Sequence, residues 1–256
     1  YVGSGGSCVN FTNPTGGGSA EWDCEKVIDG DDLGDFQALS ISFSQDGVPH
    51  IATTDVGESS GSSSGDNLIL ATYVGSGGSC VNFTDTTGGG SSAWDCEKII
   101  DGDGGVGITD SVRLSLAFSP DDAPFIATTD YNESGGSASG GTLTIARFVG
   151  SGGSCLNYDD PTGGGSADWD CEKIIDGDTF SDSDVYDLSF SPDGALYILG
   201  VQALENTGSS SGDNLIIAKQ KLPIGPLSFE LNGRLTPSGD LRYSFFDGRS
   251  PRSNLP

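Results

Sequence analysis

The sequence has little of the chemistry on which catalysis and nucleic-acid binding depend. Histidine occurs once, as His50, so a serine or cysteine nucleophile activated by a histidine base is not expected. Basic residues are scarce, at 11 against 37 acidic ones, and the formal net charge is −26. Because a surface this negative repels phosphate groups, nucleic acids and anionic membranes are poor partners.

Long apolar segments are also missing. No run approaches the roughly 20 apolar residues that a membrane-spanning helix needs, so membrane insertion is not expected. No long window keeps a 3.6-residue apolar period, which predicts that helices are nearly absent. The sequence opens at Tyr1 inside a repeat and shows no secretion signal there, as expected of a processed or excised piece.

Glycine and aspartate dominate what is present. The chain has 41 Gly, and Asp supplies 29 of its 37 acidic residues. Both residue types favour turns over helices, so a loop-rich β protein is expected. The charge itself suits a protein kept soluble outside the cell or in a salty medium.

Two motifs recur and define an internal repeat. The motif Val-Gly-Ser-Gly-Gly-Ser-Cys starts at Val2, Val74 and Val149, at spacings of 72 and 75 residues. Downstream of each copy lies Trp-Asp-Cys-Glu-Lys, which is followed by an acidic Asp-Gly-Asp turn. The chain therefore contains three tandem copies of one unit of about 72 residues.

Each unit holds four short apolar runs that read as β-strands. In the second unit these runs are residues 114–118, 125–129, 143–149 and 169–175. Residues 119–124 between the first two runs, like their counterparts 44–47 and 191–194, are rich in Pro, Asp and Gly, which predicts a tight hairpin turn.

The run Leu-Ser-Phe-Ser-Pro-Asp-Gly at residues 188–194, with variants at 39–47 and 114–123, resembles blades of bacterial cell-surface and sialidase-like β-propellers over about 220 residues. The resemblance implies an all-β fold, a β-propeller or propeller-like array of four-stranded antiparallel blades with one disulfide per repeat. An open stack of sheets whose edge strands pair with another subunit is the alternative.

The repeat boundaries suggest how the chain is divided. Residues 222–256 form a C-terminal hairpin or tail that is expected to complete the end blade or to close the ring with residues 1–30. The expected divisions are two strands forming the outer half of a first blade in 1–30, a second blade in 31–103, a third in 104–178, a partial fourth in 179–221, and the tail in 222–256.

The six cysteines fall as three pairs, each separated by 16 positions inside one repeat. This regularity favours disulfides within repeats over the other connectivities, and each closed loop is expected to stabilise its unit by about 3 kcal/mol. No closely spaced ligand pairs typical of zinc sites occur. Disulfides place the protein outside the cytoplasm, as an extracellular, cell-surface or periplasmic protein. The predicted pairs are Cys8 with Cys24, Cys80 with Cys96, and Cys155 with Cys171.

Acidic turns after the last strand of each unit are candidate Ca²⁺ ligands. Aspartates that alternate with glycine offer several oxygens on a flexible turn, although the full twelve-residue calcium loop is missing. A plain turn between blades is the alternative. The candidates are Asp29, Asp31, Asp32, Asp101, Asp103, Asp176, Asp178, Asp182 and Asp184.

The repeated tryptophans Trp22, Trp94 and Trp169 are either sugar-stacking platforms or core residues that cover the disulfides. Three N-glycosylation sequons occur, at Asn10, Asn82 and Asn132. A sialidase-like activity would need a cluster of arginines, whereas Arg113 and Arg147 are the only arginines of the repeat region.

The function expected from these features is a non-enzymatic extracellular or cell-surface scaffold that mediates adhesion or assembly. Its partners would be other protein subunits, or further copies of itself, that pair through edge strands. A multivalent carbohydrate-binding propeller that takes glycans is the first alternative, and a sialidase-like glycosidase fragment is the second. Apart from Ca²⁺, no cofactor is expected.

Overall fold

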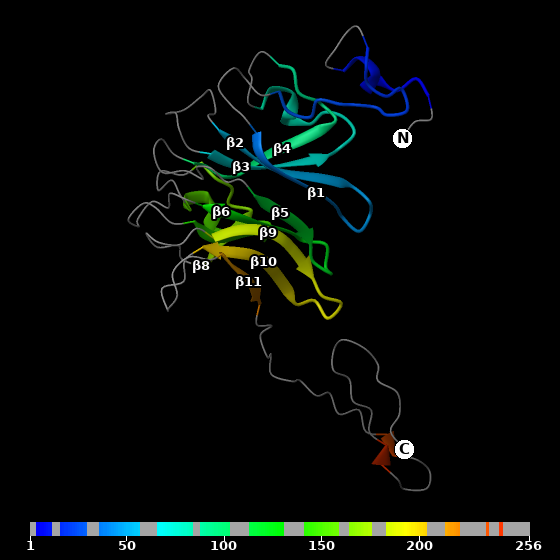
Figure 1. The fold of residues 1–256 in the computed structure, drawn as a ribbon. Coiled ribbons are helices and arrows are strands. Elements are labelled where there is room, and N and C mark those ends of the chain that lie inside the picture. The colour runs from blue at the N-terminus through cyan, green and yellow to red at the C-terminus, as the bar shows by residue number, and fades with distance from the viewer. Residues whose placement is uncertain are drawn as a thin grey trace. The chain divides into compact units, whose positions relative to one another are not determined.

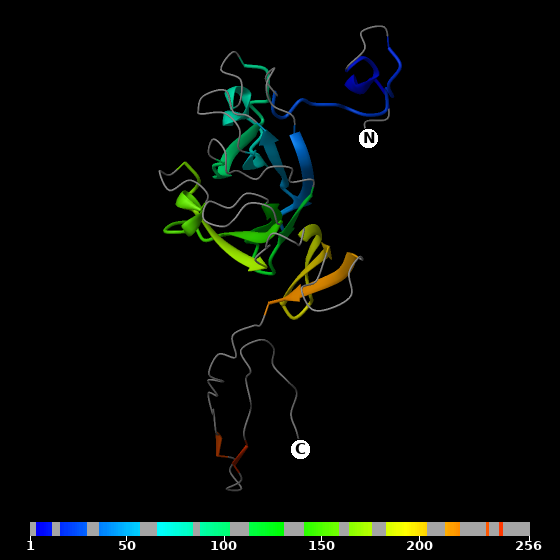
Figure 2. The same cartoon turned by 60° about the vertical axis from the view of Figure 1, so that its left-hand side comes forward.

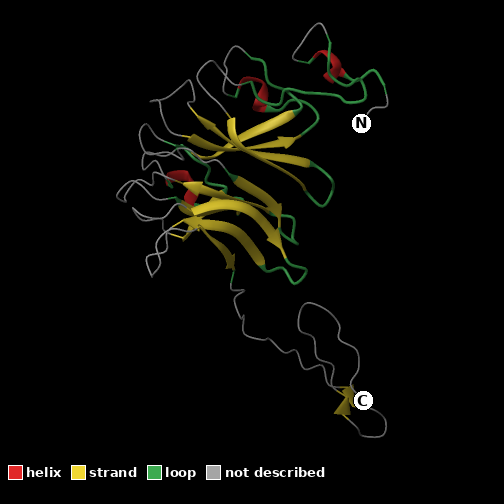
Figure 3. Cartoon of the chain, in the orientation of Figure 1, coloured by secondary structure: helices red, strands yellow, loops and turns green. Residues whose placement is uncertain are grey.

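The computed structural model describes residues 4–11, 16–29, 36–56, 66–83, 88–102, 113–130, 141–158, 164–175, 183–203, 213–220, 234–235 and 241–242. The chain divides into two compact units, Tyr1–Lys219 and Gln220–Pro256. Strands of the first unit form three antiparallel sheets, and the only helices among its described residues are three short 3-10 turns (Figure 1; Figure 3). The all-β fold predicted from the sequence is confirmed.

Each sheet is a meander in which consecutive strands pair antiparallel. The expected strands of the second unit are confirmed within one residue at most ends. The first sheet contains β1 (Phe36–Phe43), β2 (Pro49–Val56), β3 (Asp66–Tyr73) and β4 (Trp94–Ile100). The second contains β5 (Leu114–Phe118), β6 (Pro124–Asp130), β7 (Thr142–Phe148) and β8 (Trp169–Ile175). The third contains β9 (Ser183–Phe190), β10 (Leu196–Ala203) and β11 (Asp213–Lys219).

The predicted hairpins join the first two strands of every sheet. In the first hairpin the Ser44 N–H donates to the Val48 carbonyl at 3.0 Å, and the Ser44 hydroxyl donates to Asp46. Gly47 adopts a φ of 84° and Gly194 a φ of 82°, whereas Asp122 takes the same place in the second sheet with a φ of 66°. The left-handed conformation explains why glycine or aspartate ends these turns.

All three predicted disulfides are present, and each staples a loop that begins with a 3-10 turn: η1 (Ser7–Asn10), η2 (Ser79–Asn82) and η3 (Ser154–Asn157). In the second repeat the Ser79 hydroxyl donates to the Cys96 carbonyl at 3.1 Å and accepts from the Cys96 N–H at 2.9 Å. A Cβ on Gly90 would collide with the Cys80 carbonyl, which explains the glycine at this point of the loop.

The sheets pack on one another through their first strands, since β1 contacts β5 and β5 contacts β9. Backbone N–H groups at these crossings donate to serine hydroxyls of the preceding sheet, Leu116 to Ser40 and Leu188 to Ser115, both at 3.0 Å. Apolar clusters fill both spaces, one between the first two sheets and one between the last two (Figure 2). The described residues show three stacked sheets and no closed barrel or propeller.

Two regions differ from the expectation. Residues 4–11 and 16–29 hold the turn η1 and no strand, whereas two strands were expected there. The counterparts of residues 22–28 are β4 and β8, which pair with β3 and β7, and the described part of the first repeat contains no such third strand. A strand sequence without a neighbour to hydrogen-bond does not form a ladder.

In the second unit, β12 (Arg234–Leu235) pairs with β13 (Leu241–Arg242). This short ladder lies within the predicted C-terminal hairpin. Completion of the end blade by residues 222–256 stays a prediction, as do the proposed divisions of the chain.

Candidate functional site

The most regular feature of the molecule is the contact between consecutive repeats. The Gly-Gly-Gly-Ser segment of each stapled loop lies on the last strand segment of the repeat before it. The Ser91 N–H donates to the Val27 carbonyl at 2.8 Å, and the Ser166 N–H donates to the Ile99 carbonyl at 2.9 Å. Residues in the same positions of the repeat therefore build the same junction twice.

Glutamates fix the junction on its polar side. The Ser91 hydroxyl donates to Glu25, and the Ser166 hydroxyl donates to Glu97. Glu97 also accepts the indole N–H of Trp169 at 3.1 Å. The sequence analysis did not single out these glutamates and serines, although their fixed positions in Trp-Asp-Cys-Glu-Lys and Gly-Gly-Gly-Ser were a readable signal.

The three tryptophans lie in different surroundings. Trp169 is 0% exposed and Trp94 is buried beside its disulfide, so both pack in the core. Trp22 is 55% exposed, because no sheet of the described residues covers it. A sugar-stacking role requires an accessible ring, which among the three only Trp22 offers.

The acidic turns contribute to the same junctions. Asp29 pairs with Lys26 at 2.7 Å, and Asp101 pairs with Lys98 at 2.9 Å. Both carboxylates lie so close to a glycine of the next repeat, Gly89 or Gly164, that a Cβ there would collide with them. The described Asp29 and Asp101 are thus junction residues.

No group of three or more potential metal ligands occurs among the described residues. Asp184 lies on β9, and six of the candidate ligands lie outside the described residues: Asp31, Asp32, Asp103, Asp176, Asp178 and Asp182. Calcium binding stays a prediction, which calorimetric titration with millimolar Ca²⁺ tests. An absence of heat would contradict it.

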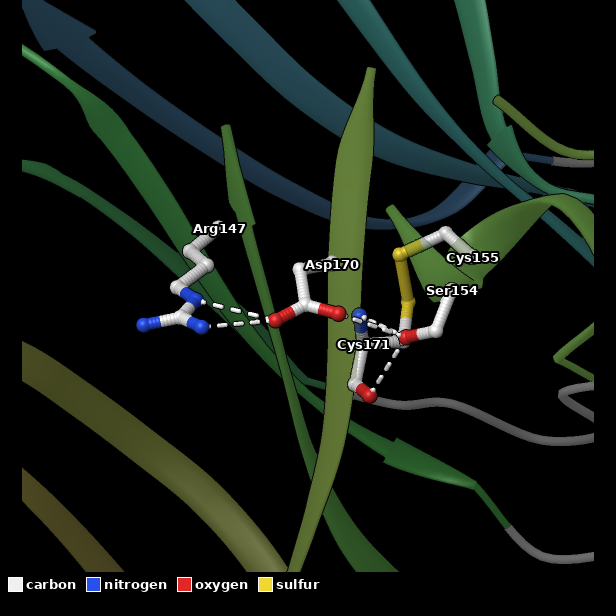
Figure 4. A network of polar contacts seen from close by, with 5 residues as sticks. All are labelled: Arg147, Ser154, Cys155, Asp170 and Cys171. Carbon is white, nitrogen blue, oxygen red and sulfur yellow. Dashed lines mark hydrogen bonds and ion pairs between the residues drawn. A yellow bond between two sulfur atoms is a disulfide. The ribbon is translucent and has the colours of Figure 1, made fainter. Parts of the chain in front are cut away.

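A polar network ties the third stapled loop to its sheet (Figure 4). Arg147 on β7 pairs with Asp170 on β8 at 2.7 Å, and the Ser154 hydroxyl donates to the same carboxylate at 2.8 Å. The hydrogen bonds from Arg147, and next those from Ser154, lower the pKa of Asp170 below its ordinary value. The network lies directly beside the Cys155–Cys171 disulfide and sets the register of β8 against β7.

Asn10 and Asn82 are both exposed at the ends of η1 and η2, where an N-linked glycan has room. Asn132 lies outside the described residues, as do the hydroxyl residues Thr12 and Thr84 of the first two sequons. Glycosylation at all three sites stays a prediction.

A cavity of about 490 Å³ lies between the first two sheets. Its wall combines aromatic rings, among them Tyr73 and Phe148, with the carboxylates of Asp46, Glu97 and Asp122. His50 packs edge-on against Phe118 in this wall, at 4.8 Å between ring centres. Burial lowers the pKa of His50, which outweighs the opposing effects of the Val48 carbonyl, Asp122 and Asp46.

The two outer faces of the stack expose apolar side chains that their counterparts bury. Leu39 on β1 is 68% exposed, whereas Leu114, in the same position of β5, is 7% exposed. Leu215 on β11 is 74% exposed, whereas Leu143, its counterpart on β7, is 1% exposed. The leading face is defined here as Leu39, Ile41 and Phe43, and the trailing face as Leu215 and Ile217; all five side chains are exposed.

Comparison with protein-family models, curated proteins and solved structures finds no match for the chain. The resemblance to surface and sialidase-like propellers therefore stays a prediction, and the argument for function rests on the residues of the chain itself.

Proposed function

We propose that the protein is a non-enzymatic extracellular or cell-surface scaffold, a propeller-like array of stapled sheets that assembles with other protein subunits through its end faces. The observation that carries this proposal is the exposure of Leu39 and Leu215, whose counterparts are buried wherever another sheet follows or precedes them. Exposed apolar rows of this kind mark interaction surfaces.

The compartment follows from the cysteines. All six are paired in disulfides, a state that is compatible with an extracellular protein and uncommon in the cytosol. Among the described residues, no helix is long and apolar enough to cross a membrane.

The proposal is tested in the cells that produce the protein. Leu39→Asp/Ile41→Asp and Leu215→Asp/Ile217→Asp each place two charges on one end face. We expect both double variants to leave the high-mass extracellular material and to appear as free protein. Val74→Asp/Val149→Asp adds the same charge on two exposed residues away from the end faces and is expected to stay incorporated. Unchanged incorporation of both end-face variants would contradict the proposal.

The cavity between the first two sheets favours carbohydrate binding as the second candidate function. Tyr73 and Phe148 are exposed aromatic rings beside carboxylates, a combination that suits stacking on a sugar and hydrogen bonding to its hydroxyl groups. A glycan array identifies a ligand, and Tyr73→Ala is then expected to weaken its binding at least tenfold. An array with no signal contradicts this candidate. No arginine lines the described cavity, so the glycosidase alternative gains no support there.

A further inference from the structure

We propose that a second copy of this chain completes the third sheet, so that molecules join head to tail. Residues 22–28 of one molecule add to the free edge of β11 in another as its fourth strand. This inference rests on the proposed function, because it names the partner and the surfaces of the assembly. Each of its three contacts repeats one that already exists inside the chain.

The first contact is the strand itself. Among the described residues β11 pairs only with β10, whereas β3 and β7 each have a fourth strand on their outer side. Residues 22–28 carry the fourth-strand sequence and form no strand. The register of β3 with β4 and of β7 with β8 therefore transfers directly: Lys219 comes to face Asp23, as Arg147 faces Asp170.

Charge complementarity supports this register. Arg147 and Asp170 form an ion pair at 2.7 Å, and Lys219 with Asp23 would restore one of the same sign and order. The backbone is compatible as well. The Val27 carbonyl already accepts the Ser91 N–H, and the Ile99 carbonyl accepts the Ser166 N–H while its strand β4 remains paired with β3.

The second contact is the stapled loop. In the chain, Ser91 and Ser166 sit on the glutamate-bearing segment of the repeat before them. Glu172 and Ile174 on β8 are the counterparts in the third repeat, and both are exposed. Ser19 belongs to the first stapled loop, where its hydroxyl accepts the Glu21 N–H as Ser91 accepts the Ala93 N–H. Ser19 of the second molecule therefore fits Glu172 and Ile174 of the first.

The third contact is apolar. Leu68 and Leu70 of β3 share a core cluster with Leu114 and Leu116 of β5. The trailing face is the counterpart of the β3 pair, and the leading face is the counterpart of the β5 pair. Contact between the two faces buries side chains that the single molecule leaves in water.

Because the two surfaces differ, the contact is heterologous and its repetition gives a ring or an open filament. This property separates the proposal from a symmetric dimer and makes it directly testable. A symmetric dimer that uses one face twice would survive when the other face is blocked.

Sedimentation velocity on the purified full-length chain, in 0.15 M salt to screen its charge, tests the prediction. Wild-type protein is expected to increase in mass with concentration. Leu39→Asp/Ile41→Asp and Leu215→Asp/Ile217→Asp each block one end and are expected to remain monomeric alone. Mixed in equal amounts, they retain one intact pair of ends and should form dimers and nothing larger.

Folding of the variants is checked by their disulfide content and thermal melting, and the substituted side chains are exposed in the single molecule. Val74→Asp/Val149→Asp carries the same added charge and is expected to assemble like wild type. The proposal is overturned if wild type stays monomeric up to its solubility limit, if a blocked variant still self-associates, or if the mixture stays monomeric.

Tryptophan fluorescence gives an independent readout. Trp22 is the only one of the three tryptophans that is exposed, so dimer formation in the mixture should reduce acrylamide quenching. Trp22→Phe is expected to abolish that change. Quenching that stays the same in a proven dimer would show that residues 22–28 lie outside the interface and would overturn the strand addition.

Charge exchange tests the register. Lys219→Asp and Asp23→Lys should each weaken self-association about two- to fivefold, the range of an exposed ion pair, and their mixture should restore it. Failure of the mixture to recover overturns this register.

The proposed function and this inference fail differently. If the purified chain is monomeric but end-face variants still leave the extracellular material, the partner is a different subunit; the scaffold then stands and the head-to-tail contact does not.

Discussion

The first and second repeats carry almost the same sequence around their tryptophan but have different structures. Residues 94–100 form the strand β4, whereas residues 22–28 form no strand. The stapled loop, in contrast, is the same in both: Ser7 and Ser79 each donate to the carbonyl of the second cysteine at 3.1 Å. Loop structure here is local, while strand structure depends on a neighbour.

The same lesson applies to burial. Leu143 and Leu215 occupy one position of the repeat, and only the presence of a following sheet decides which of them is core. Sequence similarity between repeats therefore does not predict equal energetic importance. Matched substitutions in two repeats measure how much the neighbour contributes.

The largest difference is expected for leucine truncation. Leu143→Ala removes a buried side chain from the cluster between the last two sheets and should lower the free energy of unfolding by about 2–5 kcal/mol. Leu215→Ala, on an exposed position, should change it by less than about 0.5 kcal/mol in the monomer. Urea unfolding of both variants at low concentration measures the difference. Equal losses would mean that the trailing face is already covered in the single molecule.

Disulfide removal comes next. Cys80→Ser/Cys96→Ser opens a loop whose cysteines lie in a buried cluster, and it should lower the free energy of unfolding by about 3 kcal/mol. Cys8→Ser/Cys24→Ser opens the same loop where neither cysteine is buried, so local opening of residues 4–29 is expected with little effect on the sheets. Urea unfolding reports global stability, and limited proteolysis reports the local opening. A comparable global loss in both variants would contradict the difference in packing.

The junction glutamates offer a smaller contrast. Glu97→Ala leaves the buried indole N–H of Trp169 without its acceptor and should lower the free energy of unfolding by about 1–3 kcal/mol. Glu25→Ala should be milder, because the indole N–H of Trp94 has no partner among the described residues even with Glu25 present. Thermal melting of the two variants compares them, and a larger effect of Glu25→Ala would reverse the assignment.

Much of this could be predicted from the sequence, because repeats fix positions. The disulfide pairs, the strands of the second unit and the hairpin turns follow from period, spacing and turn residues. Whether residues 22–28 form a strand, or whether Leu39 is core, depends on which sheets are neighbours, and this is a long-range property. The role of Glu97 was missed for the same reason: its partners, Ser166 and Trp169, lie in the following repeat.

The smallest effect concerns His50 and its counterpart Phe125, which make the same edge-on contact with Phe118 and Phe190, respectively. Burial lowers the pKa of His50, so the unfolded chain takes up the proton more readily than the folded one. Above about pH 6.5 both states are neutral and the group has no effect; as the pH falls below that value, stability is lost. His50→Phe should keep the packing of the second sheet's own version and remove this loss. Urea unfolding at about pH 7.5 and pH 5.5 measures it, with the wild type expected to lose more stability than the variant between the two pH values. Aspartates titrate in both proteins, so their effect cancels in the comparison. An equal loss in both proteins would show that the ring of His50 is solvated enough to titrate normally and that the cavity wall around it is open to water.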